Sequence, residues 1–125
     1  MAVQRLEIYK CLVCGIVTEI LDAGAGEPVC CGQVMQHQAE QTADPAGQKH
    51  VPIIEHRDGG IRVTVGSTPH PMETKHFIQC IELIDGQNVY RRFLSPGDEP
   101  VAWFDVESTD ARAREFCNIH GLWVS

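Results

Sequence analysis

The sequence predicts an all-β protein that consists of a small, metal-stapled N-terminal domain followed by a larger β-sandwich. Four of the six cysteines fall within residues 1–37, a segment too short to bury a stable apolar core of its own. From residue 50 onward, short apolar runs alternate with turn signals at intervals of roughly ten residues, which is typical of a sandwich. The stretch between these regions, QAEQTADPAG, is polar and reads as a linker.

The composition is that of an ordinary globular protein: 125 residues, of which 43% are hydrophobic and 22% charged. A formal net charge of −7 and the lack of a long basic run argue against nucleic-acid binding. The N-terminus has no apolar signal segment, and no run approaches the ~18 apolar residues of a membrane span. We therefore expect a soluble, cytoplasmic protein, in which clustered cysteines more often bind metal or do redox chemistry than form disulfides.

The expected strands follow the chain in order. In the N-terminal domain they are Val3 to Tyr9 and Gly15 to Leu21, with a GAGEP turn after the second. In the second domain, the turn signals DGG, DG and PGD separate apolar or alternating runs. These runs are Ile53-Ile54, Ile61 to Val65, Phe77 to Ile84, Val89 to Leu94 and Val101 to Val106. Ala111 to Phe116 is compatible with a helical turn, but its apolar positions are too few to settle the matter.

The N-terminal cysteines form a predicted four-thiolate metal site. Cys11 and Cys14 make a CxxC pair, and the adjacent Cys30 and Cys31 follow it. Four thiolates from two short loops suit zinc or iron in tetrahedral geometry. A glycine follows each pair, and glycine can adopt conformations that point backbone N–H groups at the sulfurs. Two disulfides or a purely structural zinc are the alternatives, and the cysteines alone do not decide between zinc and iron.

A second group of candidate ligands lies in the other domain. Cys117 and His120 are three apart near the C-terminus, a spacing that lets both reach one metal. His70 and His76 flank a Pro-containing loop, and His50 directly precedes an apolar run. Each lies at the edge of an expected strand, and strand edges can converge at one end of a sandwich. A single such histidine is more often a surface or hydrogen-bonded residue, but four of them with a thiolate favour a metal site.

This mixed donor set predicts a reactive centre. Imidazole and thiolate together suit iron better than magnesium or calcium, although zinc and copper are compatible with them. Five protein ligands on an octahedral metal leave one position open, which marks a reactive site rather than a structural one. His37 and His56 have no neighbouring ligands and are expected at the surface. Cys80, inside an apolar run, is expected as a small buried hydrophobe.

The cysteine pairs together with the motifs KHVPIIE, HPMETKH and CNIHG resemble desulfoferrodoxin, the two-iron class of superoxide reductase. The resemblance covers essentially the whole chain. It implies a desulforedoxin-like Fe(Cys)₄ domain at residues 1–37, a linker and active-site loop at 38–49, and an immunoglobulin-like superoxide reductase β-sandwich at 50–125. It further implies a homodimer that receives electrons from rubredoxin or a similar donor.

The same resemblance implies two iron ions per chain. Centre I is expected on Cys11, Cys14, Cys30 and Cys31. Centre II, the catalytic iron, is expected on His50, His70, His76 and His120 in the equatorial plane, with Cys117 as the axial ligand. The implied reaction is the one-electron reduction of superoxide, with two protons, to hydrogen peroxide, without release of dioxygen.

Two residues that precede His50 bear on the reaction. Lys49 is expected to add positive potential at the site, which would attract the superoxide anion and orient water. The family usually has glutamate at the position of Gln48. Because an amide is a poorer ligand for ferric iron than a carboxylate, we predict that Gln48 leaves the sixth position of the oxidised site vacant or open to water or hydroxide. We do not expect Gln48 to abolish superoxide reduction.

Three other functions compete with a reductase. A non-enzymatic electron carrier would use the four-cysteine iron alone, and its histidine cluster would be structural. A zinc-ribbon interaction module would bind only zinc and would not need four clustered histidines. A superoxide dismutase would release dioxygen, which a reductase does not. Metal content separates the first two from the reductase, and dioxygen release separates the third.

Overall fold

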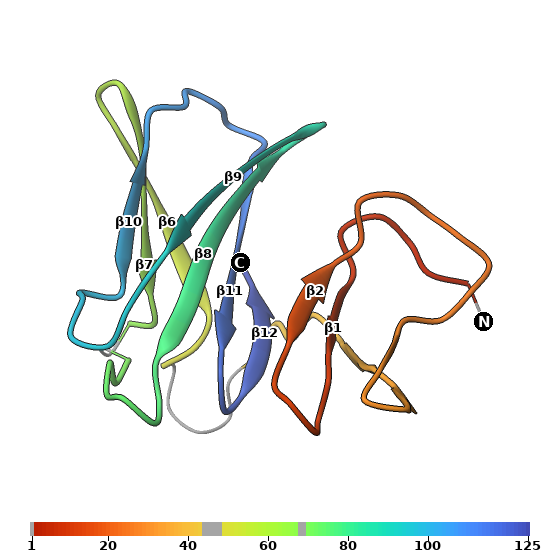
Figure 1. Ribbon diagram of the computed structural model, residues 1–125. Helices are drawn as coiled ribbons and strands as arrows, with labels where there is room; N and C mark the ends of the chain where they lie inside the picture. Colours follow the sequence, from red (N-terminus) through yellow and green to blue (C-terminus); the bar gives the residue numbers. More distant parts are fainter. Residues whose placement is uncertain (1, 44–48, 68–69) are drawn as a thin grey trace. The chain divides into compact units, whose positions relative to one another are not determined.

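The computed structural model describes residues 2–43, 49–67 and 70–125, which are arranged as strands and connecting loops (Figure 1). The chain divides into two compact units, Met1–Ala39 and Glu40–Ser125. The prediction of an all-β fold, in which a small N-terminal domain precedes a β-sandwich, is confirmed in the described residues. No helix among the described residues is long and apolar enough to cross a membrane.

The first unit is built from short strands around a small core. β1 (Ile8–Lys10), β2 (Val17–Glu19) and β5 (Gln36–Gln38) form an antiparallel sheet in the order β2-β1-β5, and β3 (Val29–Cys30) pairs with β4 (Gln33–Val34). The first two strands are shorter than the sequence predicts. The core cluster consists of Tyr9, Cys11 and Met35. Several apolar side chains remain exposed, among them Leu12, which is 66% exposed, so that apolar burial contributes little to this unit.

The described part of the second unit is a sandwich of seven strands in two antiparallel sheets, of order β10-β7-β6 and β12-β11-β8-β9. The strands are β6 (Pro52–Arg57), β7 (Gly60–Val65), β8 (Ile78–Asp85), β9 (Asn88–Phe93), β10 (Val101–Phe104), β11 (Arg112–Cys117) and β12 (Gly121–Val124). A constant-type immunoglobulin domain also divides seven strands into three and four. Here β9, the fourth strand of the sandwich, pairs with β8 and so belongs to the same sheet as β8, β11 and β12.

The core of the sandwich follows from the alternating pattern of its strands. Ile61, Val63 and Val65 on β7 have no exposed surface, and their spacing of two places them on one face. Ile81 and Leu83 on β8 are also fully buried, and they belong to the same core cluster. Each such side chain contributes about 1.5–3 kcal/mol through the removal of apolar surface from water. The same core cluster includes Ile78 at the start of β8 and Cys117 at the end of β11, so packing fixes the position of both strand ends.

The hairpin between β6 and β7 is the turn that the DGG signal predicts. Gly59 has a φ of +82°, in the left-handed region that favours glycine. Gly60 is required for a different reason, since a Cβ there would lie 2.5 Å from the carbonyl oxygen of Phe104 and from the ring of Trp103. Both glycines therefore have a conformational or steric reason for their position.

β11 is the element that the sequence does not reveal. The stretch from Ala111 to Phe116, for which a helical turn is left open, forms a strand between β8 and β12. Arg114 and Glu115, in the middle of this strand, are each 1% exposed. Because charged residues occupy buried positions, the run lacks the apolar alternation by which a strand is recognised. Cys80, which the sequence predicts to be buried, is only half-buried on β8.

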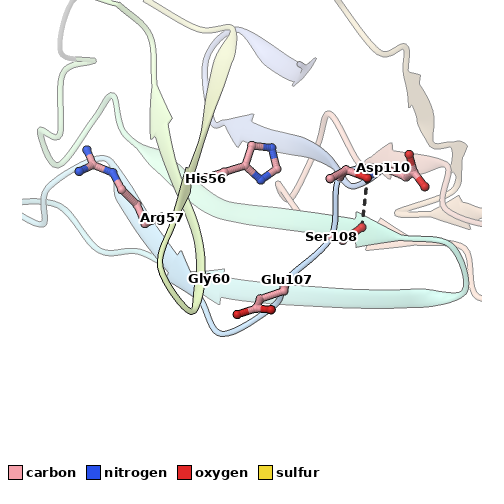
Figure 2. A pocket seen from close by; sticks show the side chains of 7 residues that line it. His56, Arg57, Gly60, Glu107, Ser108 and Asp110 are labelled. Atoms are coloured by element: carbon pink, nitrogen blue, oxygen red, sulfur yellow. Dashed lines mark hydrogen bonds between the residues drawn. The ribbon is translucent and has the colours of Figure 1, made fainter.

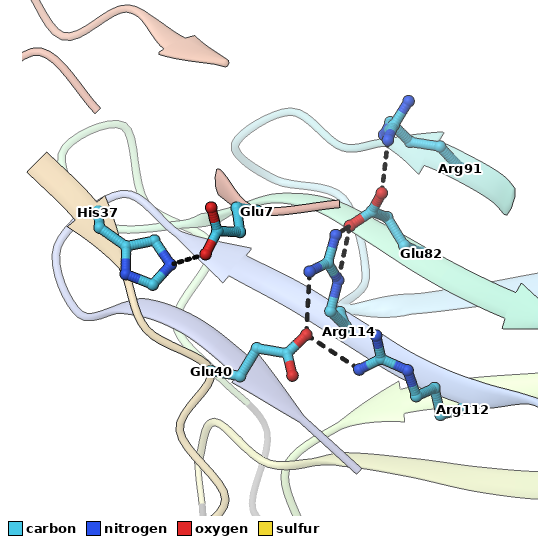
Figure 3. Close-up of polar contacts among 7 residues, drawn as sticks. All are labelled: Glu7, His37, Glu40, Glu82, Arg91, Arg112 and Arg114. Atoms are coloured by element: carbon cyan, nitrogen blue, oxygen red, sulfur yellow. Dashed lines mark hydrogen bonds and ion pairs between the residues drawn. The ribbon is translucent and has the colours of Figure 1, made fainter. Parts of the chain in front are cut away.

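Arg114 is accommodated in the interior because carboxylates from two other segments accept its hydrogen bonds (Figure 3). Its Nη2 donates to Glu82 Oε1 at 3.0 Å, and its Nη1 donates to Glu40 Oε2 at 3.0 Å. Glu40 Oε2 also accepts from Arg112 Nη1 at 2.9 Å, and Glu82 accepts from Arg91 on β9. The buried charge is thus paired, and the network attaches the segment before the sandwich to β11.

The ionisation of Glu40 is expected to make the stability of the second unit depend on pH. Burial by itself would raise the pKa of the Glu40 carboxyl, but hydrogen bonds from Arg112 and Arg114 outweigh it and lower the pKa below its ordinary value of 4.5. The stabilisation that this carboxylate provides is therefore complete above pH 4.5 and is lost as the pH falls through the lowered value. We expect Glu40→Gln to reduce the free energy of unfolding at neutral pH, and this reduction to shrink below about pH 4.5.

Denaturant unfolding followed by tryptophan fluorescence measures this difference. Both tryptophans of the sequence, Trp103 and Trp123, belong to the second unit, so the signal reports on that unit. A difference between Glu40→Gln and the wild type that stays constant from neutral pH to about pH 3 would contradict the prediction.

Candidate metal centres

The four N-terminal cysteines converge from two turns of the first unit. Cys11 and Cys14 lie in the turn between β1 and β2, and the backbone N–H of Cys14 points at Cys11 Sγ over 3.5 Å. Cys30 ends β3, and Cys31 lies in the turn to β4 with a φ of +53°. The glycines after the two pairs also have positive φ, +85° and +73°, as the sequence leads one to expect. Local backbone geometry therefore brings both pairs to one point.

The distances between these sulfurs fit a tetrahedral metal site. Cys14 Sγ lies 3.6 Å from Cys30 Sγ, and Cys30 Sγ lies 3.9 Å from Cys31 Sγ. Tetrahedral bonds of about 2.3 Å to a metal place sulfurs about 3.8 Å apart, whereas a disulfide requires about 2.05 Å. All six cysteines are free thiols, so the alternative of two disulfides is wrong.

The ionisation of these thiols also favours a bound cation. A hydrogen bond from the Cys14 backbone N–H lowers the pKa of Cys11 to about 6. Hydrogen bonds with the Cys14 and Cys11 side chains raise the pKa of Cys30 to about 12. The protein alone therefore stabilises one thiolate at the expense of its neighbours. A metal cation allows all four sulfurs to ionise together.

In the second unit, four imidazole rings form a closed ring of neighbours. The centroid separations are 4.8 Å for His50–His70, 4.8 Å for His70–His76, 4.9 Å for His76–His120 and 4.7 Å for His120–His50. Each ring is tilted by 70–81° from the next. The segments that carry them precede β6, precede β8 and follow β11, so strand ends do converge here. Such an arrangement directs one nitrogen of each ring toward a common point.

The hydrogen bonds of the rings identify these inward nitrogens. His70 Nδ1 lies 2.6 Å from the carbonyl oxygen of Pro71, which fixes that nitrogen as the N–H and leaves Nε2 as the donor to a metal. The Nε2 atoms of His70 and His76 are buried without a hydrogen-bond partner. His50 Nε2 and His120 Nδ1 lie 3.0 Å apart, and two adjacent ligands with bonds of about 2.1 Å would be about 3 Å apart. The orphaned nitrogens and this spacing fit a bound metal.

Cys117 supplies the fifth donor from the core side. It ends β11 at a β-bulge, has no exposed surface and belongs to the core cluster of the sandwich. The backbone N–H of His120 donates to Cys117 Sγ at 3.4 Å. The five donor atoms of this cluster, one from each histidine and one from Cys117, lie within 4.8 Å of one another. His120 is exposed, so solvent reaches the cluster at that ring.

Burial keeps His70 in the form that binds metal. His70 is 3% exposed, and burial lowers its pKa to about 4 although the hydrogen bond to Pro71 opposes the shift. The neighbouring histidines lower it further. At neutral pH the ring is thus uncharged and offers its lone pair.

Asn118 joins two of the segments that carry ligands, a role that the sequence does not reveal. Its Oδ1 accepts a hydrogen bond from the backbone N–H of Phe77 at 3.0 Å, and its Nδ2 donates to the carbonyl of Lys75 at 3.1 Å. The side chain thereby attaches the turn after Cys117 to the residues on both sides of His76. In the sequence, Asn118 is only a polar residue within CNIHG.

The remaining candidate residues lie outside both clusters. His37 is exposed and lies 3.4 Å from Glu7 (Figure 3). Its ring also contacts the ring of Tyr9. Lys49 is exposed and directly precedes His50, while Gln48 lies outside the described residues. His56 is exposed and lines a separate cleft of about 490 Å³ (Figure 2). The cleft has no cysteine and no second histidine, and it adds nothing to the metal clusters.

Two consecutive segments of the sequence match family models that carry the same family name. Residues 3–37 match the model described as the desulfoferrodoxin N-terminal domain, and residues 42–125 match the model described as desulfoferrodoxin. The chain belongs to the desulfoferrodoxin family. It is 54% identical over 122 residues to the desulfoferrodoxin of Syntrophotalea carbinolica, an alignment that covers 98% of this chain and 97% of that one.

The chain is also similar to proteins that are named superoxide reductase. The superoxide reductase of Pyrococcus furiosus is 35% identical over 111 residues, covering 66% of this chain and 90% of that one. The solved structure of the superoxide reductase from Treponema pallidum matches with a TM-score of 0.80 and 28% identity, covering 98% of this chain and 99% of that one. With the family shown, the Cys₄ and His₄Cys clusters fit the two iron sites of desulfoferrodoxin.

Proposed function

We propose that this desulfoferrodoxin is a superoxide reductase, which converts superoxide, one electron and two protons to hydrogen peroxide without releasing dioxygen. The observation that carries the proposal is the ring of four imidazoles closed from the core side by the buried thiol of Cys117. A purely electron-carrying protein would not need a second donor set with a free coordination position. The proposed iron ligands are Cys11, Cys14, Cys30 and Cys31 at centre I and His50, His70, His76, Cys117 and His120 at centre II.

At centre II, bound ferrous iron supplies the single electron that superoxide accepts. The protein supplies the charge and the access. Neutral imidazoles and one thiolate leave a divalent metal with net positive charge, which attracts an anion. Cys117 is fully buried whereas His120 is exposed, so superoxide and the solvent that provides protons would reach the metal from the exposed side of the cluster. The hydrogen bond from the His120 backbone N–H holds the thiolate in place.

The wider organisation is proposed on the same basis. Residues 1–37 form the centre I domain, residues 38–49 the linker and active-site loop, and residues 50–125 the catalytic sandwich. Rubredoxin or a similar small protein delivers the electron. The protein acts in the cytoplasm as a homodimer.

The stoichiometry of the reaction tests this function. The reduced protein with two irons per chain is mixed with superoxide in a stopped-flow instrument, and hydrogen peroxide and dioxygen are quantified. We expect one peroxide for each superoxide consumed and no dioxygen. Release of one dioxygen for every two superoxide ions would instead identify a dismutase, and the absence of any reaction at centre II would identify an electron carrier.

Lys49 is expected to raise the rate at which superoxide reaches the iron. Its ammonium group, next to ligand His50, adds positive potential at the site. We expect Lys49→Ala to lower the second-order rate constant roughly tenfold at low ionic strength, with a smaller effect at high salt. Lys49→Arg keeps the charge and should keep most of the rate. If the alanine and arginine variants were equally slow at all ionic strengths, attraction of the anion would not be the role of Lys49.

A further inference from the structure

Trp123 contacts the ring of an iron ligand. It lies on β12, is 5% exposed, and its indole stacks on the imidazole of His50 with centroids 4.7 Å apart and planes 18° apart. A flat, buried contact of this kind restricts rotation of the smaller ring and shields one of its faces from water. His50 precedes β6, in the other sheet of the sandwich. The indole therefore orients a ligand that its own strand does not carry.

The side chain of the same tryptophan also binds the backbone of a second ligand, His120. Trp123 Nε1 donates a hydrogen bond to the carbonyl oxygen of His120 at 3.2 Å. Gln41 Nε2 donates to that carbonyl at 2.9 Å and to the carbonyl of Leu122 at 3.2 Å. Two donors on one carbonyl fix the turn between β11 and β12, from which the His120 ring projects.

Gln41 is itself held against the free edge of β12. It forms a parallel bridge with Trp123, its N–H donates to the carbonyl of Leu122 at 3.0 Å, and its carbonyl accepts from Val124 N–H at 2.9 Å. The preceding residue, Glu40, is bound by the Arg112 and Arg114 guanidinium groups. The backbone of Gln41 is thus held by β12 and by the ion pairs of the preceding Glu40, which places its side chain at the His120 carbonyl.

We propose that Trp123 and Gln41 are positioning residues for centre II, which fix His50 and His120 relative to each other. These two ligands are 70 residues apart in sequence, yet His50 Nε2 and His120 Nδ1 lie 3.0 Å apart, and Trp123 contacts both residues. The inference rests on the proposed iron site, and it concerns how tightly and in what geometry the metal is held. Neither residue reaches the reacting atoms.

Iron release and the spectrum of the ferric centre test this role. Groups that orient metal ligands typically contribute 10- to 100-fold in metal affinity, so we expect Trp123→Leu to lose iron from centre II at least about tenfold faster under chelator. We also expect the electron paramagnetic resonance lines of ferric centre II to broaden as its geometry becomes heterogeneous. The lines of centre I in the same sample serve as the internal reference. Trp103→Phe is the matched control, since Trp103 lies half-exposed on β10 and should change neither signal.

A second pair of substitutions covers the case in which Trp123→Leu does not fold. Trp123→Phe with Gln41→Met removes both donors to the His120 carbonyl but keeps an aromatic face on His50 and the side-chain volumes. We expect this double variant to release iron several-fold faster than the wild type, and less rapidly than a folded Trp123→Leu. A folded variant with unchanged iron release and an unchanged spectrum would overturn the proposal. Because neither measurement involves superoxide, failure of the proposed reaction in the wild type would leave this result standing.

Discussion

Cys117→Ser is expected to abolish superoxide reduction while the sandwich remains folded. Serine replaces an anionic sulfur donor with a hydroxyl that stays protonated at neutral pH and is a poor ligand for iron. The loss should exceed the 10- to 100-fold that is typical of residues outside the ligand set, so we expect the rate to fall by more than about 100-fold. The absorption band from thiolate-to-iron charge transfer at the ferric centre should disappear with it. Stopped-flow mixing and the visible spectrum measure the two effects.

Cys80→Ser is the matched control for this substitution. Cys80 lies on β8 in the same sandwich, is half-buried and belongs to neither donor cluster. Cys117→Ser places a hydroxyl at a fully buried position and Cys80→Ser at a half-buried one, at a cost of about 1–3 kcal/mol where a buried hydroxyl lacks a partner. Tryptophan fluorescence verifies that each variant is folded. A Cys117→Ser protein that reduces superoxide as fast as Cys80→Ser would show that the thiolate ligand of centre II has been assigned to the wrong residue.

The metal donors could be recognised in the sequence because they are rare residue types in short motifs. CxxC, CC, HPMETKH and CNIHG contain eight of the nine, and His50 lies within KHVPIIE. Strand edges carry most of these motifs, and the structure gathers them into two compact clusters. What spacing alone does not reveal is the order of the rings, in which His50 neighbours His70 and His120 but not His76. That order depends on which strand ends meet.

The features that the sequence did not reveal depend on tertiary pairing. β11 has no apolar alternation because Arg114 is buried against Glu82 and Glu40, one on β8 and the other preceding the sandwich. A strand of this kind is recognisable only when its partners are known. Trp123 and Gln41 are similar: a tryptophan near the C-terminus and a glutamine in a polar linker have no motif of their own. Their role arises because Gln41 pairs with β12 through its backbone.

Removal of the metal from centre I is expected to unfold the first unit and leave the second intact. The unit has 39 residues, and its core cluster is formed by Tyr9, Cys11 and Met35. Chains below about 40 residues usually need a metal or disulfides to fold. Structural metal sites in small domains contribute about 10 kcal/mol or more, which exceeds what this core can supply. Hydrogen exchange should therefore show strong protection of the β1 amides with metal and almost none without it.

Zinc provides the control that separates folding from redox chemistry. Zn²⁺ suits a four-thiolate site as well as iron does, so refolding with Zn²⁺ should restore amide protection in the first unit. Unlike iron, Zn²⁺ is not redox-active and cannot donate an electron. We expect protein with zinc at centre I and ferrous iron at centre II to keep its tryptophan fluorescence and to react with superoxide at the rate of the two-iron protein. Protection of β1 in the metal-free chain would show that the core is sufficient. A loss of the superoxide reaction on zinc substitution would mean that centre I supplies an electron in the same turnover, because the fold of both units is preserved in that protein.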